Sequence, residues 1–345
     1  MTAKDRVVAL RRMFAGASLI AAMCWPQHGF AQAVTNFYQG KQITMPVASG
    51  AGGGYDTYAR TLARHMTRHI PGNPVIVPKN LPGAGGLVGA STLYNNTPHD
   101  GLTFAALSNG IALDPLFRKF PGRFEPLKFG WLGSIGKLMN VCITWHTSAV
   151  TTIAQAQQRQ VIVSASAATS NSVMMPKIAN ALLGTKFKVV SGYADSDVTL
   201  AMERGEVDGM STGWFSIKTT KKDWLDNRKI NIVVQFVAER HPDLPDVPTM
   251  VDVARTPEER QLFRLFSNEG DIGKAIMAPP DLPPATLTTL RRAFDAMARD
   301  PEFIADADRL QVERDSMPGE TLQKMIEAVA QTPPTIIGHA KALLK

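Results

Sequence analysis

The sequence predicts an α/β protein with two domains, each built on a mostly parallel sheet that is flanked by helices. Its 345 residues, 44% of them hydrophobic, are enough for two cores of ordinary size. Near the start, a strand, a glycine-rich turn and a helix follow one another twice, which is the pattern of a parallel sheet with crossover helices. Short apolar strands and helices then alternate through the middle of the chain.

The first 33 residues have the pattern of a signal peptide that is removed on export. Residues 1–12 carry four basic side chains, residues 13–25 form an apolar run, and residues 31–33 give the A-x-A pattern of a cleavage site after Ala33. The apolar run is too short to span a bilayer, and no later run reaches the ~18 residues needed. Arg11 and Arg12 leave both the Sec and the twin-arginine route open.

The composition of the remaining chain argues against nucleic-acid binding and against disulfides. Removal of residues 1–33 lowers the formal net charge from +7 to +4, and no basic run with interleaved aromatic residues remains. Cys142 is then the only cysteine, so an intramolecular disulfide is impossible. Because it lies in an apolar strand, we expect it to belong to the core.

The first strand, residues 43–48, is followed by the turn S-G-A-G-G-G and a helix over 55–70. Consecutive glycines let a ligand approach the backbone, and free amides at a helix start attract anions. Tyr55 and Asp56 follow the glycines where a P-loop needs lysine, and Tyr55 replaces the third glycine of a dinucleotide fingerprint. A small-anion site is favoured, with a tight turn that binds nothing as the open alternative.

The second repeat has a strand over 75–77, the turn N-L-P-G-A-G-G at 80–86, and a helix over 87–94 that precedes a strand over 102–107. In parallel sheets, ligands bind outside the carboxyl ends of the strands. Both glycine turns should lie at that edge, so we expect them to form one site.

The rest of the chain predicts a second domain and a helical tail. Residues 114–130 look irregular, and 241–248 are broken by prolines, which suggests a return to the first domain. Strands are expected at 131–135, 141–145, 161–163, 188–190, 207–210 and 230–237. Helices are expected at 151–160, 173–183, 195–203, 285–299, 301–310 and 319–344, the last broken at 333–334.

Five blocks in order resemble a known family. They are I-T-M-P-V-A-S-G-A-G-G-G-Y-D-T-Y-A-R (43–60), N-L-P-G-A-G-G (80–86), D-G-L-T-F (100–104), L-P-D-V-P-T (244–249) and A-P-P-D-L-P (278–283). Together they look like the periplasmic receptors of tripartite tricarboxylate transporters, often called Bug proteins. The resemblance covers nearly the whole mature chain.

The resemblance implies a type II periplasmic-binding-protein fold with the ligand between two domains. Domain 1 would comprise residues 34–138 and 239–345, and domain 2 residues 139–238. A receptor of this kind captures a small organic carboxylate by hinge closure in the periplasm and delivers it to membrane permease subunits. A subunit that presents the closed form to a membrane sensor kinase is the alternative, and no cofactor is implied.

The resemblance also implies a set of site residues. Backbone amides of the two glycine turns would hold one carboxylate of the ligand. Asp56 would order the helix start without touching the ligand. Whether the ligand is a dicarboxylate or a monocarboxylate stays open, because Asp195 stands near where the family has lysine. The ligand-binding positions are Ser49, Gly50, Ala51, Gly52, Gly53, Gly54, Tyr55, Gly83, Ala84, Gly85, Ser108, Ser166, Ala167, Thr169, Ser170, Asn171, Tyr193 and Asp195.

The sequence gives little indication of a catalytic or metal-binding site. The sequence has no G-x-S-x-G, C-x-x-C or H-E-x-x-H motif, so we expect neither an enzyme nor a metal site. His65 and His69 lie four apart on a helix, but neighbouring arginines favour an exposed basic face over a metal site. Trp214 and Phe215 follow a predicted strand, where stacking on a ligand and ordinary packing are both open.

Overall fold

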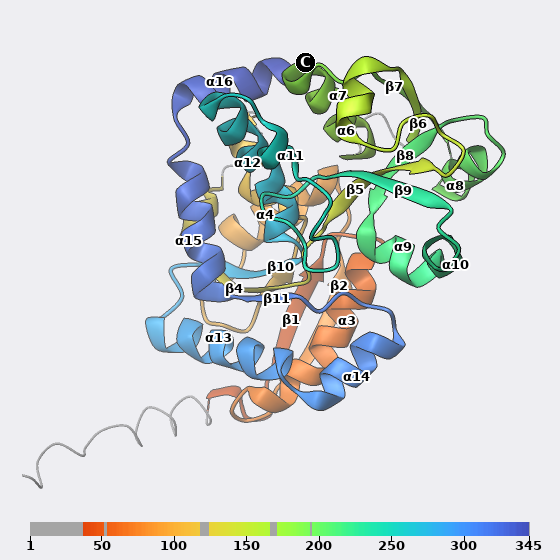
Figure 1. Ribbon diagram of the computed structural model, residues 1–345. Helices are drawn as coiled ribbons and strands as arrows, with labels where there is room; N and C mark the ends of the chain where they lie inside the picture. The colour runs from red at the N-terminus through yellow and green to blue at the C-terminus, as the bar shows by residue number, and fades with distance from the viewer. Residues whose placement is uncertain (1–36, 52–53, 118–123, 166–170, 194, 345) are drawn as a thin grey trace, which may run out of the picture.

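The computed structural model describes residues 37–51, 54–117, 124–165, 171–193 and 195–344, which form two units, each around one sheet (Figure 1). The first sheet has the strand order β11-β4-β10-β3-β1-β2. Its strands are β1 (Gln42–Val47), β2 (Val75–Asn80), β3 (Ala105–Ala106), β4 (Phe129–Ile135), β10 (Ala275–Pro280) and β11 (Ser316–Pro318). The second sheet has the order β7-β6-β8-β5-β9. Its strands are β5 (Asn140–Trp145), β6 (Val161–Ala165), β7 (Phe187–Ser191), β8 (Gly209–Gly213) and β9 (Ile230–Gln235).

Both sheets are mixed, whereas the sequence suggested mostly parallel ones. In the first, β1 pairs in parallel with β2 and β3, but β10 is antiparallel to β3 and β4, and β11 is antiparallel to β4. In the second, β6 pairs in parallel with β7 and β8, and β5 is antiparallel to β8 and β9. The antiparallel strands are β10 and β11, which come after the chain has returned to the first unit, and β5, which directly follows the first passage between the units.

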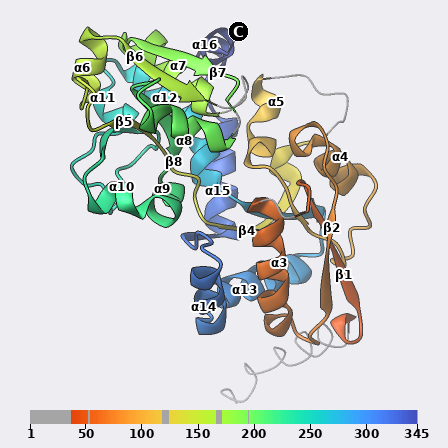
Figure 2. The same cartoon turned by 90° about the vertical axis from the view of Figure 1, so that its right-hand side faces the viewer.

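Helices cover both sheets (Figures 1 and 2). Those between strands of the first sheet are α3 (Gly54–Met66), α4 (Leu87–Asn95) and α5 (Asp114–Phe117). The second sheet carries α6 (Ile153–Gln158), α7 (Asn171–Leu183), α8 (Asp195–Glu203), α9 (Trp214–Thr220) and α10 (Lys222–Asp226). The remainder are α11 (Met250–Val253), α12 (Pro257–Ile272), α13 (Pro284–Ala298), α14 (Pro301–Arg309), α15 (Gly319–Ala330) and α16 (Pro334–Leu343). None of the described helices has the length and apolar character needed to cross a membrane.

Local sequence explains where the helices begin. The hydroxyl of Thr256 accepts a hydrogen bond from the Glu259 amide, and the Glu259 side chain accepts one from the Thr256 amide, with Pro257 at the first helical position of α12. Asp300 caps α14 by accepting a hydrogen bond from the Glu302 amide. These caps satisfy amides that a helix start otherwise leaves unpaired.

The core is shared between the two units. One cluster of buried apolar residues includes Trp131 of β4, Cys142 of β5 and Val163 of β6, together with Leu262 and Phe266 of α12. A second cluster packs α3, α13 and α14 against β1, and a third lies under α8 to α10. The expectation that Cys142 is a core residue is confirmed, since its side chain is fully buried.

The chain passes between the sheets twice. Residues 136–139 lead from β4 to β5, and residues 236–249 lead back from β9 towards α11. Through its pairings, β4 runs in the same direction as β1, β2 and β3, so its carboxyl end lies at the same edge as theirs. Because Asn140 pairs with Gly213, β5 starts where β8 ends. The carboxyl edges of the parallel strands therefore lie at the passages, on the sides that the two units turn to one another.

Several expected elements are confirmed, and others were missed. Helix α8 has the bounds that its pattern predicts, and α4, α13 and α14 differ by one residue at one or both ends. The missed elements are α5, which lies in the segment expected to be irregular, and α9, α10, α11, α12, β10 and β11. β10 reads A-I-M-A-P-P; two prolines obscure a strand that is fully buried, and a register shift accommodates them. The predicted domain boundaries fall within the two passages and stay a prediction.

Candidate functional site

The first glycine turn leaves the carboxyl end of β1. Gly50 is exposed, and a Cβ atom at this position would meet nothing within 4 Å. The Ser49 hydroxyl is buried and has no hydrogen-bond partner among the described residues, while its carbonyl accepts a hydrogen bond of 2.9 Å from Asn80 Nδ2. Ala51 is exposed and Gly54 is the first residue of α3; Gly52 and Gly53 lie outside the described residues.

A polar cluster under this turn fixes the start of α3. Asp56 is only 3% exposed. Its carboxylate accepts hydrogen bonds from Asn80 Nδ2 at 2.8 Å and from Arg60 Nε at 2.9 Å. Because Asn80 ends β2 and also holds Ser49, one amide joins the two strands, the turn and the helix. The Asp56 carboxylate is occupied within the protein and faces these partners.

The second glycine turn folds as a short 3-10 helix over Ala84–Gly86 that runs into α4. Gly83 and Gly86 have φ values of 153° and 96°, and Ala84 has a φ of 45°. The Gly86 amide donates to the Gly83 carbonyl at 2.9 Å. Gly85 lies in the middle of this helical turn. Positive φ values explain the glycines, and Ala84 shows that the backbone is held in an uncommon conformation.

Three strand ends meet at Gly86. A Cβ atom there would lie 3.1 Å from the Cβ of Ser108 and 3.3 Å from the Cβ of Ala48. Ala48 follows β1, Ser108 follows β3, and Gly86 belongs to the turn after β2. The structure thus brings the predicted Ser108 position to the second glycine turn and places both beside the end of β1. This close approach requires glycine.

Tyr55 is part of the support beneath the turns. Its hydroxyl accepts a hydrogen bond from the Asn109 backbone amide and donates one to Asn109 Oδ1. Both hydrogen bonds have a length of 3.3 Å. Asn109 in turn donates to the Glu269 carbonyl of α12 at 2.8 Å. Burial raises the pKa of Tyr55 to about 12, against the opposing effect of the Asn109 amide. Tyr55 is therefore a neutral link between α3, the segment after β3 and α12.

The predicted positions in the second unit are only partly described. Asn171 and Asp195 are the first residues of α7 and α8, and Tyr193 is partly buried against the cluster under α8 to α10. Ser166, Ala167, Thr169 and Ser170 lie outside the described residues.

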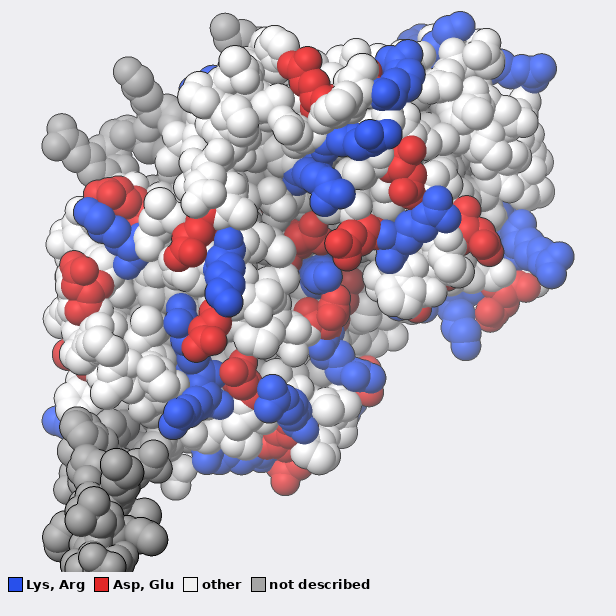
Figure 3. All heavy atoms as spheres, turned by 60° about the vertical axis from the view of Figure 1, so that its left-hand side comes forward, with Lys and Arg blue, Asp and Glu red and all other residues white. Residues whose placement is uncertain are grey.

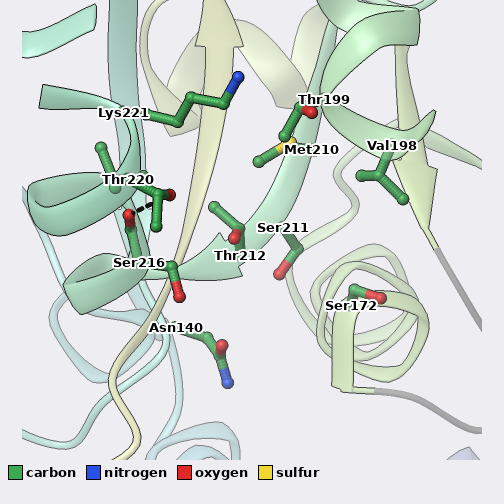
Figure 4. A pocket seen from close by; sticks show the side chains of 11 residues that line it. Asn140, Ser172, Val198, Thr199, Met210, Ser211, Thr212, Ser216, Thr220 and Lys221 are labelled. Atoms are coloured by element: carbon green, nitrogen blue, oxygen red, sulfur yellow. Dashed lines mark hydrogen bonds between the residues drawn. The ribbon is translucent and has the colours of Figure 1, made fainter. Parts of the chain in front are cut away.

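Sequence reasoning missed a pocket of about 400 Å³ in this unit (Figure 4). It lies between the ends of β5 and β8 and the helices α7, α8 and α9. Its polar lining includes Asn140, Ser172, Ser211, Thr212, Ser216 and Thr220. The run M-S-T-G-W-F-S at 210–216, which places hydroxyls at the end of a strand, was the signal available in the sequence.

A larger groove of about 850 Å³ lies beside the passages between the units. Basic and acidic residues alternate in it, among them Lys137, Lys218, Asp271 and Asp315. The same mixture of signs covers the face in Figure 3, so that face shows no large area of one charge. Such an arrangement offers no strong field that would attract a polyanion.

Next to this groove, Lys274 is 9% exposed and lies 3.7 Å from Glu313 Oε2 and 4.0 Å from the centre of the Tyr58 ring. Burial lowers the pKa of Lys274 to about 8, although Glu313 opposes this shift. The Lys274 amide donates to the Gly136 carbonyl at 3.3 Å, so this cluster adjoins the first passage between the units.

One expectation about side chains needs correction, and Trp214 fits one of the two alternatives left open for it. His65 and His69 do not form an exposed basic face, because α14 packs against α3: His65 Nε2 lies 3.0 Å from Asp306, and His69 Nε2 lies 2.7 Å from Asp300. His65 is 7% exposed. Within the described ranges, no group of three or more possible metal ligands occurs. Trp214 is 5% exposed and donates to Asp243, so it is a packed residue.

The arrangement of the first unit suits an anion rather than a reaction. Its turns present backbone and small residues at the carboxyl edge, where helices α3 and α4 begin, and helix starts favour negative charge. The thiol of Cys142 is buried, which raises its pKa to about 12 and makes it inert.

The fold defines the class of protein. The structure of a TctC solute binding protein from Polaromonas matches with a TM-score of 0.68 and 17% identity, covering 89% of this chain and 99% of that one. The periplasmic binding protein BugD matches with a TM-score of 0.57 and 20% identity, covering 89% and 98%. MatC from Rhodopseudomonas palustris with bound malate matches with 0.56 and 17%, covering 89% and 99%. The expected periplasmic-binding-protein fold is confirmed.

The sequence comparison gives the family. A profile of the tripartite tricarboxylate transporter family receptors matches residues 58–340, so the chain belongs to this family. A curated relative, the UPF0065 protein in the tcbD-tcbE intergenic region of Pseudomonas sp. (strain P51), is 28% identical over 299 residues, which is 80% of this chain and 85% of that protein. The chain is thus a solute receptor of this family and not an enzyme, as the motifs led us to expect.

Proposed function

We propose that this chain is an exported receptor that traps a small organic carboxylate between its two units and delivers it to the membrane permease subunits of a tripartite tricarboxylate-type transporter. The carboxylate lies against the backbone amides of the two glycine turns. Asp56 orders the first turn and does not touch the ligand. Closure about the two passages then brings the second unit onto the other end of the molecule.

The observation that carries this proposal is the meeting of three strand ends at Gly86. A Cβ atom there would come within 3.3 Å of both Ala48 and Ser108, so the two turns share one small area of the surface. Both turns lead into helices, and both lie at the edge that the first unit turns towards the second. The malate bound to MatC, which shares the fold, supports a carboxylate as the kind of ligand.

The periplasm is the proposed location, after cleavage at Ala33. The support is the pattern of the first 33 residues, which lie outside the described structure, and the likeness to periplasmic receptors. Mass spectrometry of the protein from a periplasmic extract tests this proposal. We expect the intact mass of a chain that begins at Val34. A chain that keeps residues 1–33 and is found in the cytoplasmic fraction would contradict the proposed location.

A thermal-shift screen tests the ligand class. The mature chain is heated with aliphatic and aromatic mono-, di- and tricarboxylates, and with nucleotides and neutral sugars. A ligand at ~100 times its dissociation constant adds about 2.7 kcal/mol to the free energy of unfolding, which raises the melting temperature by several degrees. We expect stabilisation by carboxylates. A response to nucleotides or neutral sugars alone would refute the proposal.

A further inference from the structure

The pocket in the second unit lies on the side that this unit turns to the glycine turns. Asn140 is the first residue of β5, directly after the passage from β4, and it pairs with Gly213 at the end of β8. Ser172 stands at the start of α7, which follows β6, the parallel neighbour of β8. With a volume of about 400 Å³, the pocket falls within the ~300–1,000 Å³ of small-molecule sites.

One hydroxyl among the side chains that line this pocket is fully buried and has no hydrogen-bond partner among the described residues. Ser211 is 4% exposed, and its hydroxyl is buried without a hydrogen bond. Figure 4 shows the oxygen atoms of Ser211 and Thr212 pointing into the space that the drawn side chains surround. The single hydrogen bond drawn there runs from the Thr220 hydroxyl to the Ser216 carbonyl. An unsatisfied buried hydroxyl costs roughly 1–3 kcal/mol, which a bound molecule with a matching polar atom recovers.

The charge of the pocket is the second observation. Among the described lining residues, no acid is present and the only cation is Lys221. That ammonium already lies 3.2 Å from Glu203 Oε1 and 4.7 Å from the centre of the Trp224 ring. A second carboxylate here would have only hydroxyl and amide donors and the start of α7 at Ser172 to replace its hydration, and no unpaired cation among the described residues. Hydroxyl and amide groups both donate and accept, so they match neutral hydroxyls on a ligand.

We propose that the ligands are hydroxylated monocarboxylates whose neutral, hydroxyl-bearing end is bound by the Asn140–Ser211–Thr212 pocket. This inference rests on the proposed function, because the glycine turns hold the single carboxylate. The family leaves the far end of the ligand open, and the second unit of this chain selects a neutral end over a second charge.

Calorimetric titration with three acids of six carbons tests the proposal. Gluconate carries hydroxyls, hexanoate carries none, and adipate carries a second carboxylate. We expect gluconate to bind about tenfold or more tightly than either of the others, because a site that hydrogen-bonds a hydroxyl rejects molecules that lack it. Ser211→Ala should weaken gluconate by about tenfold and leave hexanoate within about twofold.

Ser134→Ala is the matched control. Ser134 is also buried with an unpartnered hydroxyl, but it lies in β4 of the first unit. Loss of the Ser134 hydroxyl should change the affinity neither for gluconate nor for hexanoate. Equal affinities for the three acids, or equal weakening of gluconate and hexanoate by Ser211→Ala, would overturn the inference while the carboxylate proposal stands. A chain that binds none of the acids, including those of the thermal-shift screen, would refute both.

Discussion

A single amide determines the geometry of the first turn at the scale of residues. Asn80 donates to both the Ser49 carbonyl and the Asp56 carboxylate, and Asp56 also pairs with Arg60. The resemblance to the receptor family led to the prediction that Asp56, which follows the glycines, orders the helix start. It could not show Asn80 as the partner, since that contact joins positions 24 residues apart.

Asn80→Ala should therefore lower the free energy of unfolding by roughly 1–3 kcal/mol, because the buried Asp56 loses one of its hydrogen bonds. Urea unfolding measures this. Asn227→Ala removes an exposed amide that bonds to the Asp223 carbonyl and should cost much less. Equal losses in the two variants would show that the Asn80 amide is not a special support of the turn.

Gly50→Val separates ligand contact from folding. A Cβ atom at Gly50 meets nothing within 4 Å in the free protein, so the melting temperature should stay close to that of the wild type. If a carboxylate lies on this backbone, the added side chain blocks its approach, and calorimetry should show a loss of about tenfold or more in affinity. Gly338→Val, at an equally open position in α16, is the control and should keep full affinity.

At the scale of elements, the pairing of α3 with α14 was hidden from the sequence. The arginines and histidines of α3 and of the 3-10 turn that follows it (Thr67–His69) look like a solvated face, and only the fold brings the N-cap residue Asp300 and Asp306 of α14 to them. Arg68 and His69 both bind Asp300, and Arg64 and His65 both bind Asp306. Helices α13 and α14 were predicted from their apolar spacing, whereas α12, despite its length and clear cap, and β10, with its two prolines, were missed.

The Asp300 pairs make stability depend on pH in the acid range. Burial opposes ionisation of this carboxylate, but hydrogen bonds from the Glu302 amide, His69 and Arg68 outweigh it and lower its pKa from 3.8 to about 2. A lowered pKa contributes stability above the unfolded value of 3.8, and this contribution is lost as the pH falls from about 4 to about 2. Asp300→Asn keeps a capping group but removes the charge.

Urea unfolding of Asp300→Asn and of the wild type should differ at pH 6 and converge near pH 2. A difference that is the same at both pH values would assign the effect to capping instead of charge. Asp308→Asn, which removes a more exposed partner of Arg314, should change stability less at pH 6.

At the scale of the whole molecule, the two passages between the sheets determine that the carboxyl edges of the two units face one another. The alternation of strands and helices and the two glycine turns allowed a prediction of two α/β units with a site at the carboxyl edge. The hydroxyl-lined pocket as a whole could not be predicted, because its side chains come from β5, β8 and three helices, with one to three from each. These side chains are far apart in the sequence and are brought together only by the order of the strands and helices in the fold.

Gly136, at the start of the first passage, should tolerate no side chain. It has a φ of 77°, and a Cβ atom there would lie 2.8 Å from the Glu313 Cβ and 2.9 Å from the Glu313 carbonyl oxygen. Gly184 has a similar φ of 69° but open space around it. Gly184→Ala should cost roughly 1–2 kcal/mol from the backbone alone, and Gly136→Ala clearly more in a urea titration. If the two variants lost similar amounts of unfolding free energy, the backbone at Gly136 would be able to shift away from Glu313 without strain.

The crystal structure of the mature chain with the tightest-binding acid from the screen tests the central claim most directly. We expect the carboxylate oxygens within ~2.7–3.2 Å of backbone nitrogens in residues 49–54 and 83–86, with the far end beside Ser211 and the two units closed around the ligand. An acid bound in the charged groove near Lys137 and Lys218, with both glycine turns unoccupied, would contradict the account.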